Sequence, residues 1–211
     1  MIQQQPNRFK VNLIGNTMVG KTTIVNRLRT GHFVADSIST IGASFVTLRK
    51  ESINFEIWDT AGQERYLALI PMYFRDVKII IFVFDVNIKE SIKYINKYKD
   101  VINDKPNVKI IILGNKTDLL EEKYSLEELT IEINKNFEDL LLTDKIHGLY
   151  FISTKDGNNF DEFLEHFCEC AKIFPIDDIN NNINIKTANN ISLDNNISLD
   201  KKEEVEVSNC C

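Results

Sequence analysis

Apolar and β-branched residues occur in short runs along the chain, and longer segments with helical periodicity lie between them. This alternation over residues 9–174 predicts an α/β domain whose mostly parallel sheet is covered by helices. The six strands that we expect are residues 9–15, 44–48, 54–59, 79–85, 109–115 and 148–153. Helices are expected to begin after Gly20 and near Glu90, Ser125 and Asn159.

Two features of the pattern predict how the strands are arranged. Residues 79–85 and 109–115 are apolar at nearly every position, as central strands covered on both faces must be. Residues 44–48 and 54–59 are separated by a short polar link, which favours an antiparallel hairpin.

The composition changes after Pro175, where Asn, Ser, Asp and Ile dominate and the unit NNISLD occurs twice in tandem. Such a segment cannot bury enough apolar surface to fold. We therefore expect a short N-terminal extension at residues 1–8, one folded domain at 9–174 and a disordered tail at 175–211.

Charge and hydropathy argue against two classes of function. The chain has 25 Lys and Arg against 31 Asp and Glu, a net charge of −6, so it offers no bulk positive field to a nucleic acid. Its longest apolar run, Ile79–Phe84, is far shorter than the roughly 20 residues that cross a bilayer.

The cysteines lie in two close pairs, which do not form a disulfide framework. In the first pair, His166, Cys168 and Cys170 fall on an expected helix, where residues two apart point about 200° apart and cannot close on one ion. We expect one buried thiol and one surface residue there, not a zinc site.

A glycine-rich motif, GNTMVGKT at Gly15–Thr22, follows the first expected strand and opens a helix. This is the context of a phosphate-binding loop of the form GxxxxGK[ST]. Gly15 and Gly20 let backbone N–H groups face phosphate oxygens. Lys21 supplies a cation for the β and γ phosphates, and the Thr22 hydroxyl can bind Mg²⁺. The motif alone predicts only a nucleoside triphosphate.

The base is indicated by NKTD, Asn115–Asp118, at the end of another expected strand, where open α/β sheets bind ligands. The Asp118 carboxylate can accept hydrogen bonds from N1–H and the 2-amino group of guanine, which adenine lacks. An Asn/Asp turn after a strand is common in isolation, but beside a phosphate loop the guanine interpretation is favoured.

A third motif, WDTAGQE at Trp58–Glu64, places Asp59 near the metal and Gln63 near the terminal phosphate. A neutral Gln can orient an attacking water through its hydrogen bonds. Gln63 is therefore our candidate catalytic residue.

With these motifs on residues 8–174, the chain resembles the Ras superfamily of small GTPases, and within it the Rab family. The segments TIGASF, ERYLALIPMYFRD and FISTK look like Rab switch and base-closing segments. Ala43 and Pro71–Met72 most resemble the early-endosomal branch. The resemblance implies the P-loop GTPase fold and a slow hydrolysis of GTP to GDP and phosphate that controls vesicle trafficking.

The resemblance also implies roles for single residues. Thr40 should close onto Mg²⁺ and the γ-phosphate, which the Gly62 N–H should contact as well. Phe33 and Lys116 should lie on the two faces of guanine. The implied nucleotide-binding residues are Gly15, Met18, Val19, Gly20, Lys21, Thr22, Thr23, Phe33, Thr40, Asp59, Gly62, Asn115, Lys116, Asp118, Ser153, Thr154 and Lys155, and the metal residues are Thr22, Thr40 and, through water, Asp59.

Partners follow from the resemblance in the same way. Phe45, Trp58 and Tyr73 match the aromatic triad that Rab proteins show to effectors, and hairpin core is the less favoured alternative for Phe45 and Trp58. The implied partners are an exchange factor, a GTPase-activating protein that supplies charge in trans, effectors, a GDP-dissociation inhibitor and an escort protein. We expect a monomer that binds no nucleic acid.

The last two residues, Cys210 and Cys211, resemble the double-geranylgeranyl site of Rab proteins. Two idle thiols are the alternative. Because one lipid chain gives only marginal attachment, both cysteines should be needed. This predicts location on the cytoplasmic face of intracellular membranes, endosomal by the branch resemblance, with a cytosolic pool.

Some residues depart from the Rab pattern. Thr17 and Met18 replace small residues in the phosphate loop, which leads to the hypothesis of slowed hydrolysis, and Asp76 stands where Gly is common. The alternative function is therefore a nucleotide-binding scaffold whose hydrolysis is nearly silent. A P-loop kinase or ATPase conflicts with Asp118.

Overall fold

The computed structural model describes residues 8–35, 40–50, 53–62, 69–120 and 125–175. The chain divides into two units, Met1–Phe174 and Pro175–Cys211. Gln63, the NNISLD repeat and the terminal cysteine pair lie outside the described residues.

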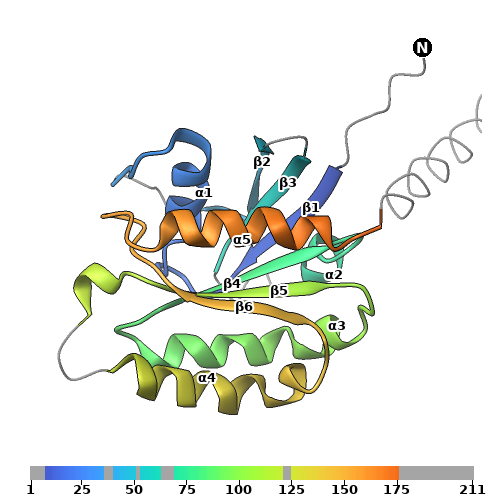
Figure 1. The fold of residues 1–211 in the computed structure, drawn as a ribbon. Helices are drawn as coiled ribbons and strands as arrows, with labels where there is room; N and C mark the ends of the chain where they lie inside the picture. The colour runs from blue at the N-terminus through green and yellow to red at the C-terminus, as the bar shows by residue number, and fades with distance from the viewer. Residues whose placement is uncertain (1–7, 36–39, 51–52, 63–68, 121–124, 176–211) are drawn as a thin grey trace, which may run out of the picture. The chain divides into compact units, whose positions relative to one another are not determined.

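The first unit is built on a six-stranded sheet in the order β2-β3-β1-β4-β5-β6, so the expected α/β fold is confirmed (Figure 1). All neighbouring strands are parallel except β2 and β3, which form the predicted antiparallel hairpin. β6 begins two residues before its predicted start. The strands are β1 (Arg8–Ile14), β2 (Ala43–Lys50), β3 (Ile53–Thr60), β4 (Ile79–Asp85), β5 (Lys109–Asn115) and β6 (Ile146–Phe151).

Helices cover both faces of this sheet. Figure 1 shows α1 and α5 on one face and α3 and α4 on the other. The helical elements are α1 (Lys21–Thr30), α2 (Ile70–Tyr73), the 3₁₀ helix η2 (Lys89–Lys97), α3 (Lys99–Asn103), the 3₁₀ turn η3 (Thr117–Leu119), α4 (Leu126–Leu141) and α5 (Phe160–Lys172). The Ser125 hydroxyl accepts the Glu128 N–H at 3.1 Å and caps α4, which begins where the sequence predicts a helix.

The helix expected near Glu90 is not one continuous α-helix. It consists of the 3₁₀ helix η2 followed by the short α3. The buried residues of η2 are Ser91, Ile92, Tyr94 and Ile95, which form two pairs three positions apart. That spacing equals the 3.0-residue turn of a 3₁₀ helix, so the two members of each pair lie on the same side of the helix.

Aromatic and β-branched side chains fill the core on both faces. All seven residues of β4 are buried, as a central strand requires. Under α5 the Phe55 and Phe167 rings lie 4.3 Å apart. On the opposite face Phe82 packs edge-on against Phe137 of α4 at 5.3 Å.

The expectation of one buried and one surface cysteine in α5 is wrong, because Cys168 and Cys170 are both buried. The buried strip of this helix includes Phe163 and Phe167 and is wide enough to take in both thiols. Among the described residues, no three His, Cys, Asp or Glu side chains gather where they could hold a metal.

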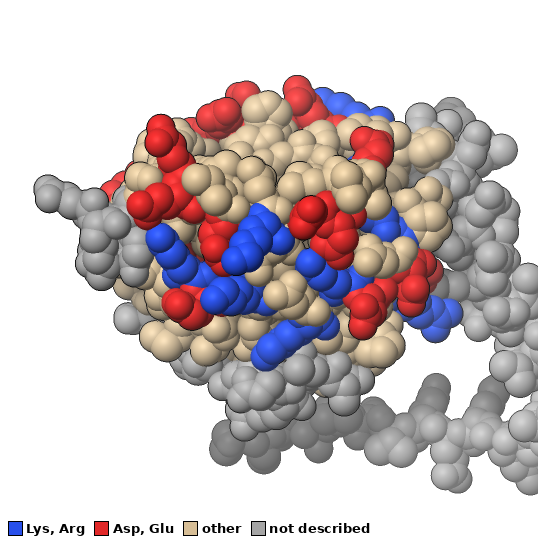
Figure 2. Space-filling view, turned by 90° about the horizontal axis from the view of Figure 1, so that it is seen from below, with Lys and Arg blue, Asp and Glu red and all other residues tan. Residues whose placement is uncertain are grey.

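The outer surface is mixed in charge where Figure 2 shows it, with basic and acidic side chains interleaved. Two ion pairs join neighbouring elements there: Lys89 to Glu128 at 3.0 Å and Lys99 to Asp139 at 2.6 Å. In the part of the chain that the structure describes, no helix has the length and apolar character to span a bilayer.

Asp76, just after α2, has a φ of 58°, the left-handed region that favours glycine. A non-glycine residue in this conformation destabilises the folded state by about 1–2 kcal/mol. Replacing it with glycine removes this strain but makes the unfolded chain more flexible, which cancels part of the gain. We predict that Asp76→Gly raises the free energy of unfolding by about 0.5 kcal/mol and that Asp76→Val lowers it. Urea unfolding at saturating GDP measures both, and a Gly variant less stable than the wild type would contradict the strain.

Candidate nucleotide-binding site

One pocket lies at the carboxyl edge of the sheet, lined by residues that follow β1, β3, β5 and β6. In open parallel sheets this is the position of the ligand crevice. Its cavity volume is about 370 Å³. The lining residues are Thr17, Met18, Gly20, Lys21, Thr22, Thr23, Phe33, Ala35, Thr40, Thr60, Ala61, Gly62, Asn115, Lys116, Asp118, Leu119, Thr154 and Lys155.

The phosphate loop leaves β1 at Gly15, whose φ is 146°. A Cβ here would overlap the backbone carbonyl of Val83 in β4, so only glycine lets the loop turn this close to the sheet. Gly20 then forms the N-cap of α1. The positive end of the α1 dipole therefore faces the pocket, which favours an anion.

Lys21 lies inside this loop with only 6% of its surface exposed. Its ammonium donates to the carbonyls of Gly15 at 2.9 Å and Asn16 at 2.7 Å. Burial lowers the pKa of Lys21 to about 8, and the charge of Asp59 opposes this shift. A buried cation whose hydrogen bonds in the described residues go to carbonyls is well placed to gain from an anionic ligand.

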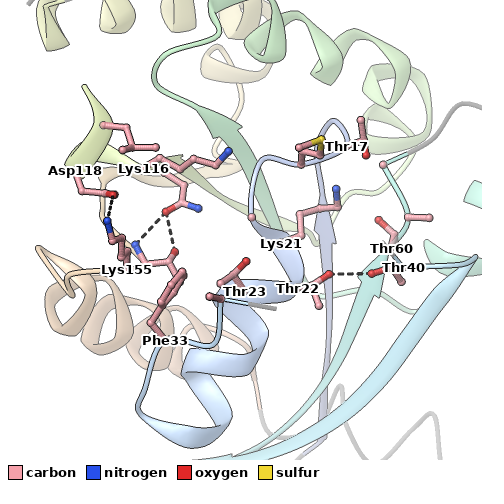
Figure 3. Close-up of a pocket in the computed structure, with 18 residues that line it drawn as sticks. Thr17, Lys21, Thr22, Thr23, Phe33, Thr40, Thr60, Lys116, Asp118 and Lys155 are labelled. Carbon is pink, nitrogen blue, oxygen red and sulfur yellow. Dashed lines mark hydrogen bonds and ion pairs between the residues drawn. The ribbon is translucent and has the colours of Figure 1, made fainter. Parts of the chain in front are cut away.

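Three oxygen-bearing side chains meet at one end of the pocket. The Thr22 hydroxyl lies 2.8 Å from the Thr40 hydroxyl and donates to Asp59 at 2.6 Å. Thr40 also donates to Asp59, at 3.1 Å, and Figure 3 shows the contact between Thr22 and Thr40. Thr40 precedes β2, and its approach to Thr22 means that this segment is closed over the phosphate loop.

These three residues fit a magnesium ion. Asp59 is completely buried, and its Oδ1 has no hydrogen-bond partner among the described residues. Burial raises the pKa of Asp59, although the hydrogen bonds from Thr22 and Thr40 and the charge of Lys21 act to lower it. Hydroxyl and carboxylate oxygens are the donors that Mg²⁺ prefers, and a cation would compensate the buried carboxylate.

Asn115 joins the parts of the pocket from the end of β5. Its side-chain amide donates to the carbonyl of Val19 at 2.9 Å. Its carbonyl oxygen accepts from the N–H and the hydroxyl of Thr154, at 3.1 and 2.7 Å. Asn115 thus ties the phosphate loop to the loop after β6, and this role was not expected from the motif.

Asp118 lies at the opposite end of the pocket from Thr22 (Figure 3). Its Oδ1 accepts from the Ser153 hydroxyl at 2.8 Å, and its Oδ2 lies 3.8 Å from the Lys155 ammonium. These two contacts hold the side chain in one orientation, and a carboxylate can accept from two N–H groups.

Two side chains flank this end of the pocket. Lys116 has a φ of 70° and pairs with the buried Asp85 at 2.7 Å, which fixes the course of its alkyl stem. Figure 3 shows Phe33 across the pocket from Lys116. Phe33 is 38% exposed, so its ring is available to a planar ligand.

Gly62 follows β3 and packs on the phosphate loop. A Cβ on Gly62 would overlap the backbone of Asn16 and Thr17. Gly62 is thereby held against the phosphate loop, and it is one of the residues that line the pocket.

The three aromatic residues of the expected effector surface form a continuous row. The Phe45 and Trp58 rings lie 5.4 Å apart, and the Trp58 and Tyr73 rings 6.2 Å apart. Phe45 is half exposed, which disfavours the core alternative for this residue, whereas Tyr73 is only 5% exposed.

Most of the predicted nucleotide-binding residues line the pocket, and four stand behind it. Gly15, Val19, Asp59 and Ser153 shape or hold lining residues instead. Sequence reasoning did not assign Thr60, Ala61, Leu119 and Ala35 to the site. Thr60 and Ala61 lie within the WDTAGQE motif and Leu119 directly follows NKTD, so these motifs could have indicated them, whereas no pattern marks Ala35.

The geometry defines a nucleotide-binding protein of the P-loop class, and comparisons with known proteins identify its family. The sequence profile of the Ras family matches residues 10–172. The chain is 37% identical to the Ras-related protein Rab-5A of Dictyostelium discoideum over 176 residues, covering 80% of this chain and 81% of the relative. It is 35% identical to the Ras-related protein Rab5 of Nicotiana tabacum (79% and 80% covered) and to the Ras-related protein Rab-22A of Homo sapiens (82% and 86% covered).

The chain therefore belongs to the Ras family of small GTPases, and within it to the Rab proteins. As a member it binds guanine nucleotides and hydrolyses GTP, and it works with regulators and effectors.

The guanine end of the pocket gives a direct prediction. Asp118→Asn replaces one of two acceptor oxygens by a donor that repels guanine N–H groups, so GDP affinity should fall about 10- to 100-fold. Xanthosine diphosphate has an acceptor where guanine has its 2-amino group, so its affinity for the variant should fall less than that of GDP, or rise. Binding constants from fluorescent nucleotide titration measure this, and Asp156→Asn, an exposed neighbour with the same charge change, is the control. Equal losses for both nucleotides would refute base recognition by Asp118.

Proposed function

We propose that this protein is a Rab-type GTP switch that regulates vesicle trafficking in the early endocytic pathway and recruits effectors when GTP is bound. One observation carries the proposal: a single pocket has the Thr22–Thr40–Asp59 cluster at one end and Asp118 at the other, with Lys21 between them. The early-endosomal assignment rests on similarity to proteins named Rab5 and Rab22.

In this proposal Thr22 and Thr40 hold Mg²⁺ through their hydroxyls and Asp59 holds it through water. The ion would neutralise phosphate charge and orient the β and γ phosphates. Lys21 binds the same phosphates and exchanges its carbonyl partners for phosphate oxygens. Thr40 and the Gly62 N–H are then held by the γ-phosphate.

Gln63 is the proposed catalytic residue, which orients the attacking water by donating and accepting hydrogen bonds. Loss of the γ-phosphate removes the contacts that keep Thr40 and Gly62 in place. The segments before β2 and after β3 would then loosen. The output is a change in the surface that carries Phe45, Trp58 and Tyr73, to which we assign the effectors.

The regulators follow from slow steps in this cycle. An exchange factor would speed the release of GDP, and an activating protein would supply a charge in trans that accelerates hydrolysis by about 10³ to 10⁵. We propose a monomer carrying two geranylgeranyl groups on Cys210 and Cys211, with an escort protein and a GDP-dissociation inhibitor as further partners. The domain at 9–174 would act at the cytoplasmic face of endosomal membranes.

The alternative, a scaffold with nearly silent hydrolysis, rests on Thr17 and Met18. Both residues line the pocket, and the Met18 side chain is 81% exposed with a φ of 61°. The two side chains therefore lie beside the phosphate region of the pocket and leave it open.

Single-turnover hydrolysis of bound GTP separates the switch from the scaffold. The switch predicts a measurable rate that Gln63→Leu lowers about 10- to 100-fold, because the water loses its orienting group. A Thr17→Ala/Met18→Ala variant tests whether these side chains slow the wild type. A wild-type rate that Gln63→Leu leaves unchanged would support the scaffold.

Localisation tests the trafficking role. We expect an N-terminally tagged protein to label early-endosomal membranes in its native cell, and a Cys210→Ser/Cys211→Ser variant to be diffuse, because no lipid then anchors it. Each single cysteine variant should be largely diffuse as well. Labelling of another membrane would contradict the endosomal assignment alone, whereas a diffuse wild type would contradict the anchor.

A further inference from the structure

A buried tyrosine outside the sequence motifs contacts Gly62 on the side that faces away from the phosphate loop. The Tyr94 hydroxyl, on η2, donates to the Gly62 carbonyl at 2.9 Å. Tyr94 is only 6% exposed, so water competes little for this bond. Because η2 packs on β4 and α4, the donor is held by the core and not by a loop.

A second tyrosine supports the first. The Tyr98 ring lies 5.7 Å from the Tyr94 ring and stacks on Phe74 at 5.7 Å. Tyr98 is itself only 4% exposed, so its ring is a fixed part of the core against which Tyr94 packs. This packing holds the Tyr94 ring, and with it the hydroxyl that donates to the Gly62 carbonyl.

Gly62 is fixed from both sides. On one side it lies so close to Asn16 and Thr17 that a Cβ would overlap their backbone, and on the other the Tyr94 hydroxyl holds its carbonyl. The segment before β2 is closed at the same time, with Thr40 2.8 Å from Thr22. The Tyr94 bond therefore belongs to the closed arrangement of the pocket.

We propose that Tyr94 is a positioning residue that holds Gly62 against the phosphate loop and so favours a nucleotide with a γ-phosphate over GDP. This rests on the proposed function, in which the Gly62 N–H contacts the γ-phosphate. When Gly62 moves away after hydrolysis, Tyr94 loses the carbonyl, so its bond stabilises only one state of the switch.

Tyr94→Phe tests the proposal, because it removes one hydroxyl and keeps the ring that packs on Tyr98. Dissociation constants are measured for GDP and for GTPγS, both with Mg²⁺, on the full-length wild type and variant. GTPγS affinity should fall about fivefold and GDP affinity should stay within about twofold, since one buried hydrogen bond is lost in one state only. Tyr150→Phe is the matched control, because Tyr150 stacks on His166 outside the pocket, and neither constant should change.

The outcomes separate this inference from the function on which it rests. A wild type that binds neither nucleotide would overturn the proposed function and the role of Tyr94 with it. A wild type that binds both, with a Tyr94→Phe variant that changes neither constant or both equally, would overturn the role of Tyr94 alone. Thermal unfolding with GDP bound shows whether the variant is folded.

Discussion

The arrangement of the pocket depends on the buried side chain of Asn115, which is only 2% exposed. One amide satisfies the carbonyl of Val19 and the N–H and hydroxyl of Thr154. These groups belong to loops after β1 and β6, which lie on either side of β4 and β5 in the sheet. Because the amide is buried, losing any of its partners would leave an unsatisfied polar group, so the two loops are fixed together. The phosphate and guanine ends of the pocket thereby keep a constant separation.

Electrostatics at the phosphate end complement this rigid frame. Lys21 is a buried cation and Asp59 a buried carboxylate, and burial shifts the pKa of each toward its neutral form. Both shifts describe a site whose own charges are incompletely compensated by the protein. Phosphate oxygens beside Lys21 and a cation beside Asp59 would compensate them together. This explains why nucleotide and magnesium should bind as a unit, and why Thr40, which touches both Thr22 and Asp59, would respond to them.

Much of the fold follows from the sequence because its strands are marked by strong local signals. The apolar runs that form β4 and β5 and the short link between β2 and β3 define the sheet and its one antiparallel pair. The motifs located the pocket because each lies at the carboxyl end of a strand.

What could not be predicted depends on tertiary contacts. The three-residue spacing of Ile92 and Ile95 also suits an α-helix locally, and only the packed structure reveals the 3₁₀ helix. The bridging role of Asn115 and the reach of Tyr94 to Gly62 join residues 39 and 32 positions apart, so no local pattern indicates them. Both cysteines of α5 are buried because large neighbouring rings widen the covered strip, which periodicity alone does not show.

In the proposed switch the γ-phosphate controls the segments around β2 and β3, and Trp58, the chain's single tryptophan, reports on both. It lies in β3 beside Asp59, with its ring against Phe45 and Tyr73. The most direct measurement is its fluorescence in the GDP-bound and GTPγS-bound protein, followed by the time course after loading with GTP. We predict two distinct spectra, with the GTP signal relaxing to the GDP signal as hydrolysis proceeds. Superimposable spectra from protein that demonstrably binds both nucleotides would contradict the switch.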